Sequence, residues 1–271
     1  MTVIACKPLG KTLIAAGLCA LFASALFSST SAHAGDALDH ILKSKELRVA
    51  VPVDYPPYGY VGPDMTPQGL DIDVAALMAK KLGVKLQLVP VTAPNRVAYI
   101  QSGKADFTIS SLGKTAEREK VIDYSIAYSP FFDAVFGAAA LPVKTLADMA
   151  GKTVSVTRGS MQDRELTDAA PDAVTKRFED NNSTISAFLS GQTQMVAIGT
   201  TVAAALKQKN PNMDIELKVV LSNAPNYIGM NKDQPELRAR VNEIIRQAKA
   251  DGTLDAISQK WLGAPAGELP E

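Results

Sequence analysis

The sequence predicts an α/β fold of two lobes, each a mostly parallel sheet flanked by helices. Short β-rich runs alternate with segments of helical periodicity along nearly the whole chain. The alternation forms two similar series, one beginning near residue 47 and one near residue 152. Extended segments near 129–133 and 222–227 join the two series. Small polar and charged residues follow the strand ends, where open parallel sheets bind ligands. We therefore expect the active surface to lie between the lobes.

The first 34 residues have the pattern of a secretory signal peptide. Lys7 and Lys11 precede an apolar run from Leu13 to Phe27, and Ala32-His33-Ala34 follows as a small-x-small cleavage site. The run of about 15 residues is short for a membrane span, which needs roughly 20. We expect cleavage after Ala34 and an exported, soluble protein.

Few residues are suited to catalysis or metal binding. Both cysteines, Cys6 and Cys19, lie in the predicted signal peptide, and Leu18 makes lipid attachment at Cys19 a poor match. The only histidine after the signal peptide is His40, too few for a histidine metal site or a Ser-His-Asp triad. We therefore expect neither a histidine metal site nor such a triad, and no thiol chemistry after the signal peptide.

The charge balance argues against a nucleic-acid partner. Of 28 basic and 28 acidic residues, only Lys7 and Lys11 lie in the first 34, so the remainder carries 26 basic and 28 acidic residues and a net charge of −2. A nucleic-acid-binding surface would require a basic excess.

The 237 residues after the signal peptide suffice for two medium domains. Because the last helices follow the second extended segment, we expect them to return to the first lobe. The predicted boundaries are 1–34 for the signal peptide, 35–131 and 225–271 for lobe 1, and 132–224 for lobe 2.

The first series begins with a short amphipathic helix and a buried strand, since no charge follows Arg48 in the run to Val53. Two prolines among three tyrosines in 54–60 predict an irregular loop with aromatic side chains. Gly83 and Gly103 are helix stop signals. The expected elements are a helix 36–43, a strand 47–53, the loop 54–60, a helix ending at 82, a strand 84–89, a helix 95–102, a strand from 106, a turn 128–130 and an extended segment 131–140.

The second series repeats the alternation and then ends in two helices. Its expected elements are a short helix 146–149, a strand 152–157, a helix to 169, a strand 174–178, a helix 182–190, a strand 195–198, a helix 200–209, strands 215–220 and 227–230, and helices 234–249 and 253–261.

The segment from Asp106 to Ser125 has the strongest functional pattern. A short buried strand breaks into small polar residues, and a charged helical turn follows with Thr115 as its expected N-cap. Hydroxyls, backbone N–H groups and the Arg118 guanidinium at such a junction suit a carboxylate. Taken alone, an ordinary strand-turn-helix with a solvated arginine is the alternative.

Several segments together resemble the extracellular solute-binding proteins of polar amino-acid ABC importers, with the type II periplasmic binding protein fold, or Venus flytrap. In family order they are LRVAVPVDYPPYGY, GLDIDVAALMAKKLG, NRVAYIQSGKADF, SSLGKTAEREKVIDYS, GKTVSVTRGS, ISAFLSGQ and ADGTLDAISQKWLG. The resemblance implies a periplasmic protein that captures a small amino acid or related carboxylate between its lobes. It also implies a binding protein and not an enzyme, with no catalytic residue, metal or cofactor. Such a protein would deliver this ligand to an inner-membrane permease with a cytoplasmic ATPase, and we expect a monomer.

The resemblance also implies a ligand site. Arg118 falls on the arginine that grips the ligand carboxylate, and Arg96 on an arginine of the glutamate/aspartate branch. The remaining positions are aromatic, small or at helix N-termini. The predicted ligand-binding residues are Tyr55, Tyr58, Arg96, Ser110, Ser111, Gly113, Arg118, Gly159, Ser160 and Thr200.

Three positions depart from the family pattern. Gly199 stands where the family has the aspartate that binds the ligand amino group, Pro52 where many members have a polar residue, and Gly113 where a hydroxyl usually points at the ligand. Either Asp54 or another acid substitutes, or the ligand lacks the amino group. Because Arg118 and Arg96 add positive charge, we expect an acidic amino acid or related carboxylate, with a neutral polar amino acid as the nearest competitor.

Ordinary structural roles remain open for several of these residues. Tyr55 and Tyr58 could only stiffen their loop, and Arg96 could lie on a helix surface. Arg158 suits a solvated rim position, while Asp71 and Asp73 suit the start of a helix. At the level of function, a dehydratase-like enzyme on the same fold and a ligand-sensing protein are the alternatives.

Overall fold

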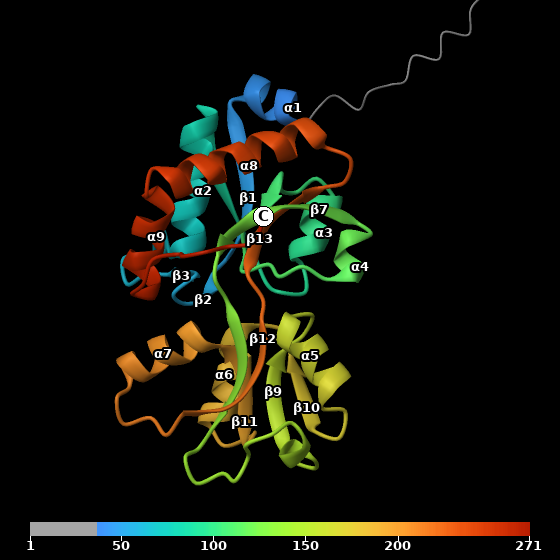
Figure 1. The fold of residues 1–271 in the computed structure, drawn as a ribbon, viewed down its shortest axis with the longest axis vertical. Coiled ribbons are helices and arrows are strands. Elements are labelled where there is room, and N and C mark those ends of the chain that lie inside the picture. Colours follow the sequence, from blue (N-terminus) through green and yellow to red (C-terminus); the bar gives the residue numbers. More distant parts are fainter. Residues whose placement is uncertain (1–36) are drawn as a thin grey trace, which may run out of the picture. The chain divides into compact units, whose positions relative to one another are not determined.

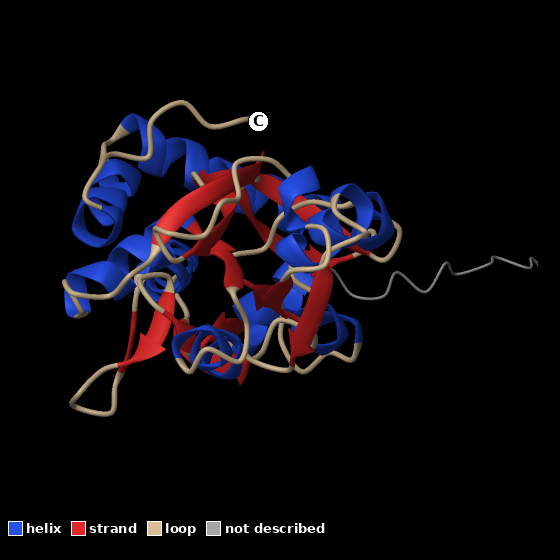
Figure 2. Cartoon of the chain, turned by 90° about the horizontal axis from the view of Figure 1, so that it is seen from below, coloured by secondary structure: helices blue, strands red, loops and turns tan. Residues whose placement is uncertain are grey.

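The computed structural model describes residues 37–271, so the predicted signal peptide lies outside the described residues. Helices flank the strands on the outside (Figures 1 and 2). The helices are α1 (Ala37–Ser44), α2 (Leu70–Leu82), α3 (Arg96–Gln101), α4 (Ala116–Glu119), a 3-10 turn (Ala147–Met149), α5 (Met161–Ala169), α6 (Asn181–Leu189), α7 (Thr200–Lys209), α8 (Pro235–Ala250) and α9 (Thr253–Leu262).

The first sheet has the strand order β5-β1-β6-β13-β7. Its strands are β1 (Glu46–Pro52), β5 (Lys85–Val91), β6 (Phe107–Thr108), β7 (Ile122–Ser129) and β13 (Asn226–Asn231). β1 runs parallel to β5 and β6, whereas β13 runs antiparallel to β6 and β7. This sheet and helices α1–α4, α8 and α9 form the first lobe, because α8 packs on β7, and α9 packs on α2 and α8.

The second sheet has the order β10-β9-β11-β8-β12. Its strands are β8 (Phe132–Gly137), β9 (Thr153–Thr157), β10 (Val174–Phe178), β11 (Met195–Gly199) and β12 (Glu216–Asn223). β9 is parallel to β10 and β11, whereas β8 is antiparallel to β11 and β12. With helices α5–α7 it forms the second lobe (Figure 1).

Two adjacent segments connect the sheets. β7 continues through Pro130 and Phe131 into β8, and β12 continues through Ala224 and Pro225 into β13. The Ala224 N–H donates to the Phe131 carbonyl over 2.9 Å. The ladder on either side pairs Asn226 with Ser129 and Asn223 with Phe132. The crossovers therefore form one narrow hydrogen-bonded ribbon, as a hinge requires.

Two predicted elements differ from the structure. Residues 54–60 are not irregular throughout, since β2 (Asp54–Tyr55) pairs with β3 (Gly59–Val61), which pairs with β4 (Pro67–Gln68). The prolines fall in the turn of this hairpin, where a missing N–H costs no ladder bond. The expected turn at 128–130 begins later, because β7 stays paired with β13 as far as Ser129.

No helix among residues 37–271 is long and apolar enough to cross a membrane.

Candidate ligand-binding site

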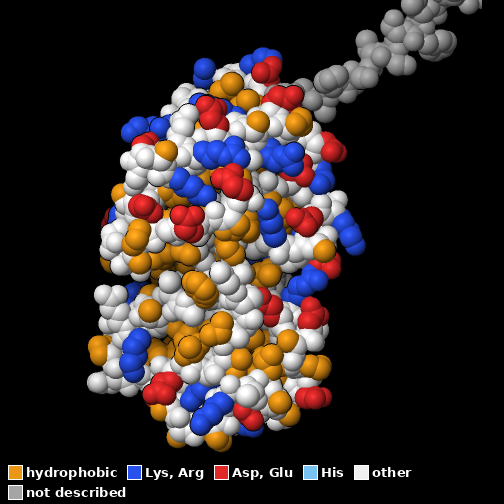
Figure 3. All heavy atoms as spheres, viewed as in Figure 1, with side chains coloured by type: hydrophobic (Ala, Val, Ile, Leu, Met, Phe, Trp, Pro, Cys, Tyr) orange, Lys and Arg blue, Asp and Glu red, His pale blue; other side chains and the backbone are white. Residues whose placement is uncertain are grey.

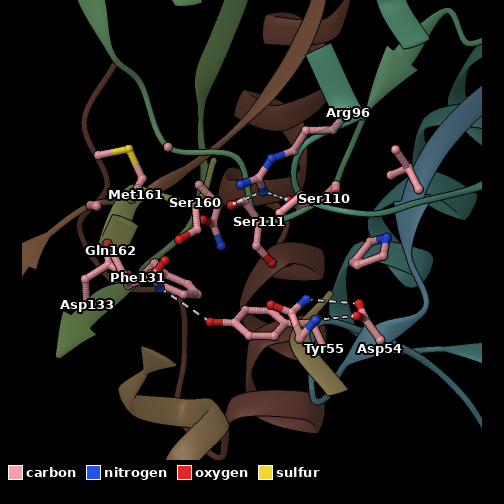
Figure 4. A pocket seen from close by; sticks show the side chains of 17 residues that line it. Asp54, Tyr55, Arg96, Ser110, Ser111, Phe131, Asp133, Ser160, Met161 and Gln162 are labelled. Atoms are coloured by element: carbon pink, nitrogen blue, oxygen red, sulfur yellow. Dashed lines mark hydrogen bonds between the residues drawn. The ribbon is translucent and has the colours of Figure 1, made fainter. Parts of the chain in front are cut away.

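A cavity of about 30 Å³ lies between the two lobes, beside the crossovers. Figure 4 shows Arg96 and Ser110 on one side of it and Phe131, Asp133 and Gln162 on the other. Of the residues predicted from the sequence, six line this cavity: Tyr55, Arg96, Ser110, Ser111, Gly113 and Ser160.

Arg96 is a buried residue at the start of α3, and not a surface residue. Its Nη1 donates to the carbonyls of Ser110 over 2.5 Å and Ser111 over 3.1 Å. Its Nε has no hydrogen-bond partner among the described residues. Burial, and secondarily the charge of Arg118, lower the pKa of Arg96 to about 9, so the guanidinium stays charged at neutral pH. Arg96 therefore provides a fixed positive charge with a donor still available.

Ser111 has an unusual backbone conformation that Asp71 supports. Its φ is 46°, in the left-handed region that non-glycine residues rarely adopt. The Asp71 Oδ2 accepts from the Ser111 N–H over 2.9 Å and from its hydroxyl over 3.1 Å. Asp71 Oδ1 accepts from the Tyr128 hydroxyl over 2.7 Å. Asp71 is thus more than a charge at the start of α2: it positions the small polar residues at the cavity.

The Asp71 carboxyl lies fully inside the first lobe. Burial raises its pKa to about 7, although its hydrogen bonds from Tyr128 and Ser111 oppose that shift. Asp73 lies two residues further along α2. Its carboxylate accepts hydrogen bonds at the surface from Trp261 Nε1 and Lys260 Nζ, each over 2.7 Å.

Tyr55 and Tyr58 are both buried and connect the lobes. The Tyr55 hydroxyl accepts from the Gly199 N–H over 3.0 Å, and the Tyr58 hydroxyl accepts from Thr201 Oγ1 over 3.0 Å. Their rings stack at a centroid distance of 6.1 Å, and both pack against Phe131. Of the two, only Tyr55 lines the cavity, whereas the Tyr58 side chain is fully buried in the core.

Ser160 is the N-cap of α5, where its hydroxyl accepts from the Asp163 N–H over 3.1 Å. This cap brings the first turn of α5 to the cavity, including Met161 and Gln162. A Cβ atom on Gly113 would lie 2.8 Å from Met161 Cγ. The methionine of the second lobe thus fills the space that a side chain at position 113 would need.

Arg118 does not line the cavity. Thr115 caps the short helix α4 as expected, accepting from the Arg118 N–H over 3.1 Å. The Arg118 guanidinium donates to the Gly113 carbonyl and, in the second lobe, to the Gly159 carbonyl, each over 2.8 Å. Tyr58, Gly159 and Thr200 also lie outside the lining, and Thr200 is the first residue of α7.

Further contacts hold the lobes together around the cavity. The Asp54 carboxylate accepts from the Asn181 N–H over 2.7 Å and from Asn181 Nδ2 over 2.9 Å at the start of α6. Glu117 of α4 and Arg164 of α5 form an ion pair. Arg158, expected on the rim, is exposed and pairs over 2.7 Å with Glu179 of its own lobe, so it does not join the lobes. The described structure is therefore a closed form of the two-lobed molecule.

Sequence reasoning missed several polar residues of the cavity, chiefly Asp133, Gln162 and Asn226. Asp133 is fully buried in β8. Burial and then the charge of Glu165 raise its pKa well above the usual range of an aspartate. The signal was present, because Asp133 is the only charged residue of the apolar run 131–140. In residues 37–271 no group of three or more His, Cys, Asp or Glu side chains is arranged to hold a metal ion.

Known proteins share this architecture and sequence pattern. The L-cystine-binding protein TcyJ of Escherichia coli (strain K12) is 26% identical over 234 residues, covering 84% of this chain and 86% of its own. The cyclohexadienyl dehydratase of Pseudomonas aeruginosa is 36% identical, but over 110 residues, or 40% of this chain and 41% of its own.

Among solved structures, a solute receptor for L-cysteine from Neisseria gonorrhoeae superposes with a TM-score of 0.80 at 28% identity, covering 86% of this chain and 99% of the receptor. Such type II periplasmic binding proteins share the two-lobed fold described above. The model of the bacterial extracellular solute-binding proteins, family 3, matches residues 47–264. The chain therefore belongs to the bacterial extracellular solute-binding proteins of family 3.

Proposed function

We propose that this protein is the periplasmic solute-binding component of an ABC importer and captures one small amino acid or related carboxylate between its lobes. The observation that carries the proposal is the closed cavity, where buried Arg96 keeps a free donor beside Ser110 and Ser111. A buried guanidinium with an N–H group still free suits a carboxylate. The relatives that are named for binding cystine, glutamine or arginine support an amino-acid ligand.

Binding requires the lobes to move. The cavity lies between lobes that hydrogen bonds join on both sides, so an amino acid enters only when the lobes part. Residues 35–131 and 225–271 would move as one lobe and 132–224 as the other, about the ribbon at 130–131 and 224–225. The ligand then favours closure by its contacts to both lobes.

Within this proposal the predicted residues have two kinds of role. Those lining the cavity contact the ligand: Tyr55, Arg96, Ser110, Ser111, Gly113 and Ser160. Tyr58, Arg118 and Gly159 act on the closed arrangement around it, Tyr58 through its bond to Thr201 and Arg118 through its bond to Gly159. Thr200 lies outside the lining, at the start of α7.

We propose no enzymatic reaction and no nucleic-acid partner. The dehydratase relative matches 40% of the chain, whereas the solute-binding family matches residues 47–264. On the face shown in Figure 3, acidic and basic side chains are interspersed rather than gathered into one basic patch. The expected partners are the small ligand and an inner-membrane permease with its cytoplasmic ATPase, and the protein itself would be a monomer.

A thermal-shift screen tests this function. The protein is unfolded, dialysed, refolded and mixed separately with the twenty proteinogenic L-amino acids, L-cystine, succinate and glutarate. A ligand at 100 times its Kd stabilises by about 2.7 kcal/mol. For a chain of this length that raises Tm by on the order of 5 to 10 °C. The proposal predicts such a shift for one or a few of these compounds, and a flat response to all of them would contradict it.

A further inference from the structure

Asp133 is a buried acid of the cavity whose carboxylate has no partner. It is 0% exposed and lines the cavity from β8, and neither of its carboxylate oxygens has a hydrogen-bond partner among the described residues, because the Ser222 hydroxyl beside it donates to Glu165. An unpaired buried carboxylate destabilises a protein, and such groups are rare outside functional sites. Asp133 therefore has acceptor capacity directed to whatever occupies the cavity.

Its place in the sheet connects it to the missing family aspartate. β8 and β11 are antiparallel, and Asp133 lies directly opposite Gly199 in their register. Side chains at directly opposite positions of a ladder lie on the same face of the sheet, with Cβ atoms about 4.5–5.5 Å apart. A carboxylate at position 133 can therefore take the place of one at position 199, because the two positions are neighbours on adjacent strands.

Phe131 explains why position 199 carries no acid. A Cβ atom on Gly199 would lie 2.5 Å from Phe131 Cζ and 3.0 Å from Cε2. The ring also packs against Tyr55 and Tyr58, with centroid distances of 6.4 and 5.2 Å. The aromatic cluster therefore occupies the space that an aspartate at 199 would use.

The other free polar groups of the cavity are donors. Arg96 Nε and Asn226 Nδ2 are buried without a partner among the described residues, and both residues line the cavity with Asp133. Two unpaired donors and one unpaired carboxylate match a ligand that has both a carboxylate and an ammonium group. The only other acid of the lining, Asp54, already accepts two hydrogen bonds from Asn181.

From this arrangement we infer that Asp133 receives the α-ammonium group of a zwitterionic amino acid with an uncharged side chain, in place of an acid at position 199. The inference rests on the proposed function and specifies its ligand class. Arg96 and Asp133 would pair with the carboxylate and the ammonium group of the ligand itself, and Asp54 already accepts two hydrogen bonds from Asn181, so the lining offers no further free charged group to a ligand side chain. The missing aspartate at 199 therefore does not indicate a ligand without an amino group.

The test compares two ligands and two variants by calorimetry on the refolded protein. One ligand is the amino acid that binds most tightly among the twenty, and the other is the carboxylic acid that differs from it only by lacking the amino group. The inference predicts that the tightest amino acid has an uncharged side chain, and that Asp133→Asn weakens its binding about 30- to 100-fold. Because the des-amino acid has no ammonium group, the same variant should change its Kd less than threefold.

Asp172→Asn is the matched control, since Asp172 is an exposed aspartate of the same lobe that does not line the cavity. Its Kd for the amino acid should stay within threefold of the wild-type value. Equal losses for both ligands in Asp133→Asn, or no loss for either, would overturn the inference while leaving the proposed function intact. No binding of any amino acid or carboxylate by the wild type would overturn the proposed function itself.

The wild-type protein also gives a test that needs no variant to fold. The assignment predicts that it binds the amino acid at least 30-fold more tightly than the des-amino acid. Equal affinities for the two compounds would overturn the role of Asp133. A preference for an acidic or basic amino acid would overturn the ligand class.

Discussion

Arg118 contacts the backbone of both lobes, and its truncation tests whether closure supports binding. Arg118→Ala removes the bonds to the Gly113 and Gly159 carbonyls. Hydrogen bonds to charged groups are worth about 1.5–3 kcal/mol each, so we expect the Kd of the ligand to rise about tenfold to a hundredfold. Calorimetry with the tightest ligand measures this change.

Arg158→Ala is the control for Arg118. Arg158 is an exposed arginine two residues before Ser160, and it pairs with Glu179 of its own lobe. The Kd of the Arg158→Ala variant for the same ligand should match that of the wild type. If Arg118→Ala also leaves the Kd unchanged, Arg118 contributes neither to the site nor to closure.

The sequence predicted the polar residues near strand ends better than the residues inside strands. Ser110 and Ser111 were identified because small polar residues follow a buried strand, and Thr115 as an N-cap by its position before charged helical residues. Asp133 was missed because it lies within a strand, and its position opposite Gly199 depends on the pairing of β8 with β11. Pairing between distant strands is not encoded in a local pattern.

At the scale of elements, the packing between the end of β11 and the start of β8 can be tested through Gly199. Gly199→Ala places a Cβ against the Phe131 ring, which is fixed by two tyrosines. Overpacking of this kind costs about 1–3 kcal/mol in the free energy of unfolding. Urea denaturation of the ligand-free protein measures the loss.

Phe131→Leu combined with Gly199→Ala provides the matched control. The smaller side chain makes room for the Cβ, so the double variant should lose less stability than the sum of the two single changes. A purely additive result would show that Phe131 does not determine the residue at position 199.

Element types followed from hydrophobic periodicity and stop signals, whereas strand lengths depended on tertiary pairing. The helix ending at Leu82 was predicted from its apolar spacing and Gly83, and α2 ends there. β7 reaches Ser129 because β13, about 100 residues later, pairs with it. The hairpin within 54–68 formed around the same prolines that argued for an irregular loop.

At the scale of the whole molecule, the closed form is held by bonds on both sides of the cavity. Asp54 and Asn181 join the lobes near the aromatic cluster, while Arg118 and Gly159 join them near α4 and α5. The connecting ribbon is only two strands wide, so few contacts within it resist bending. A ligand that contacts Arg96 in one lobe and Asp133 in the other would stabilise the closed form and not the open form.

Small-angle scattering of the refolded protein, with and without a saturating amount of the amino acid found in the thermal-shift screen, tests capture by closure most directly. The account predicts that the radius of gyration falls on saturation, because the ligand shifts an open population toward the closed form described here. An identical scattering curve at a ligand concentration that calorimetry shows to be saturating would contradict it.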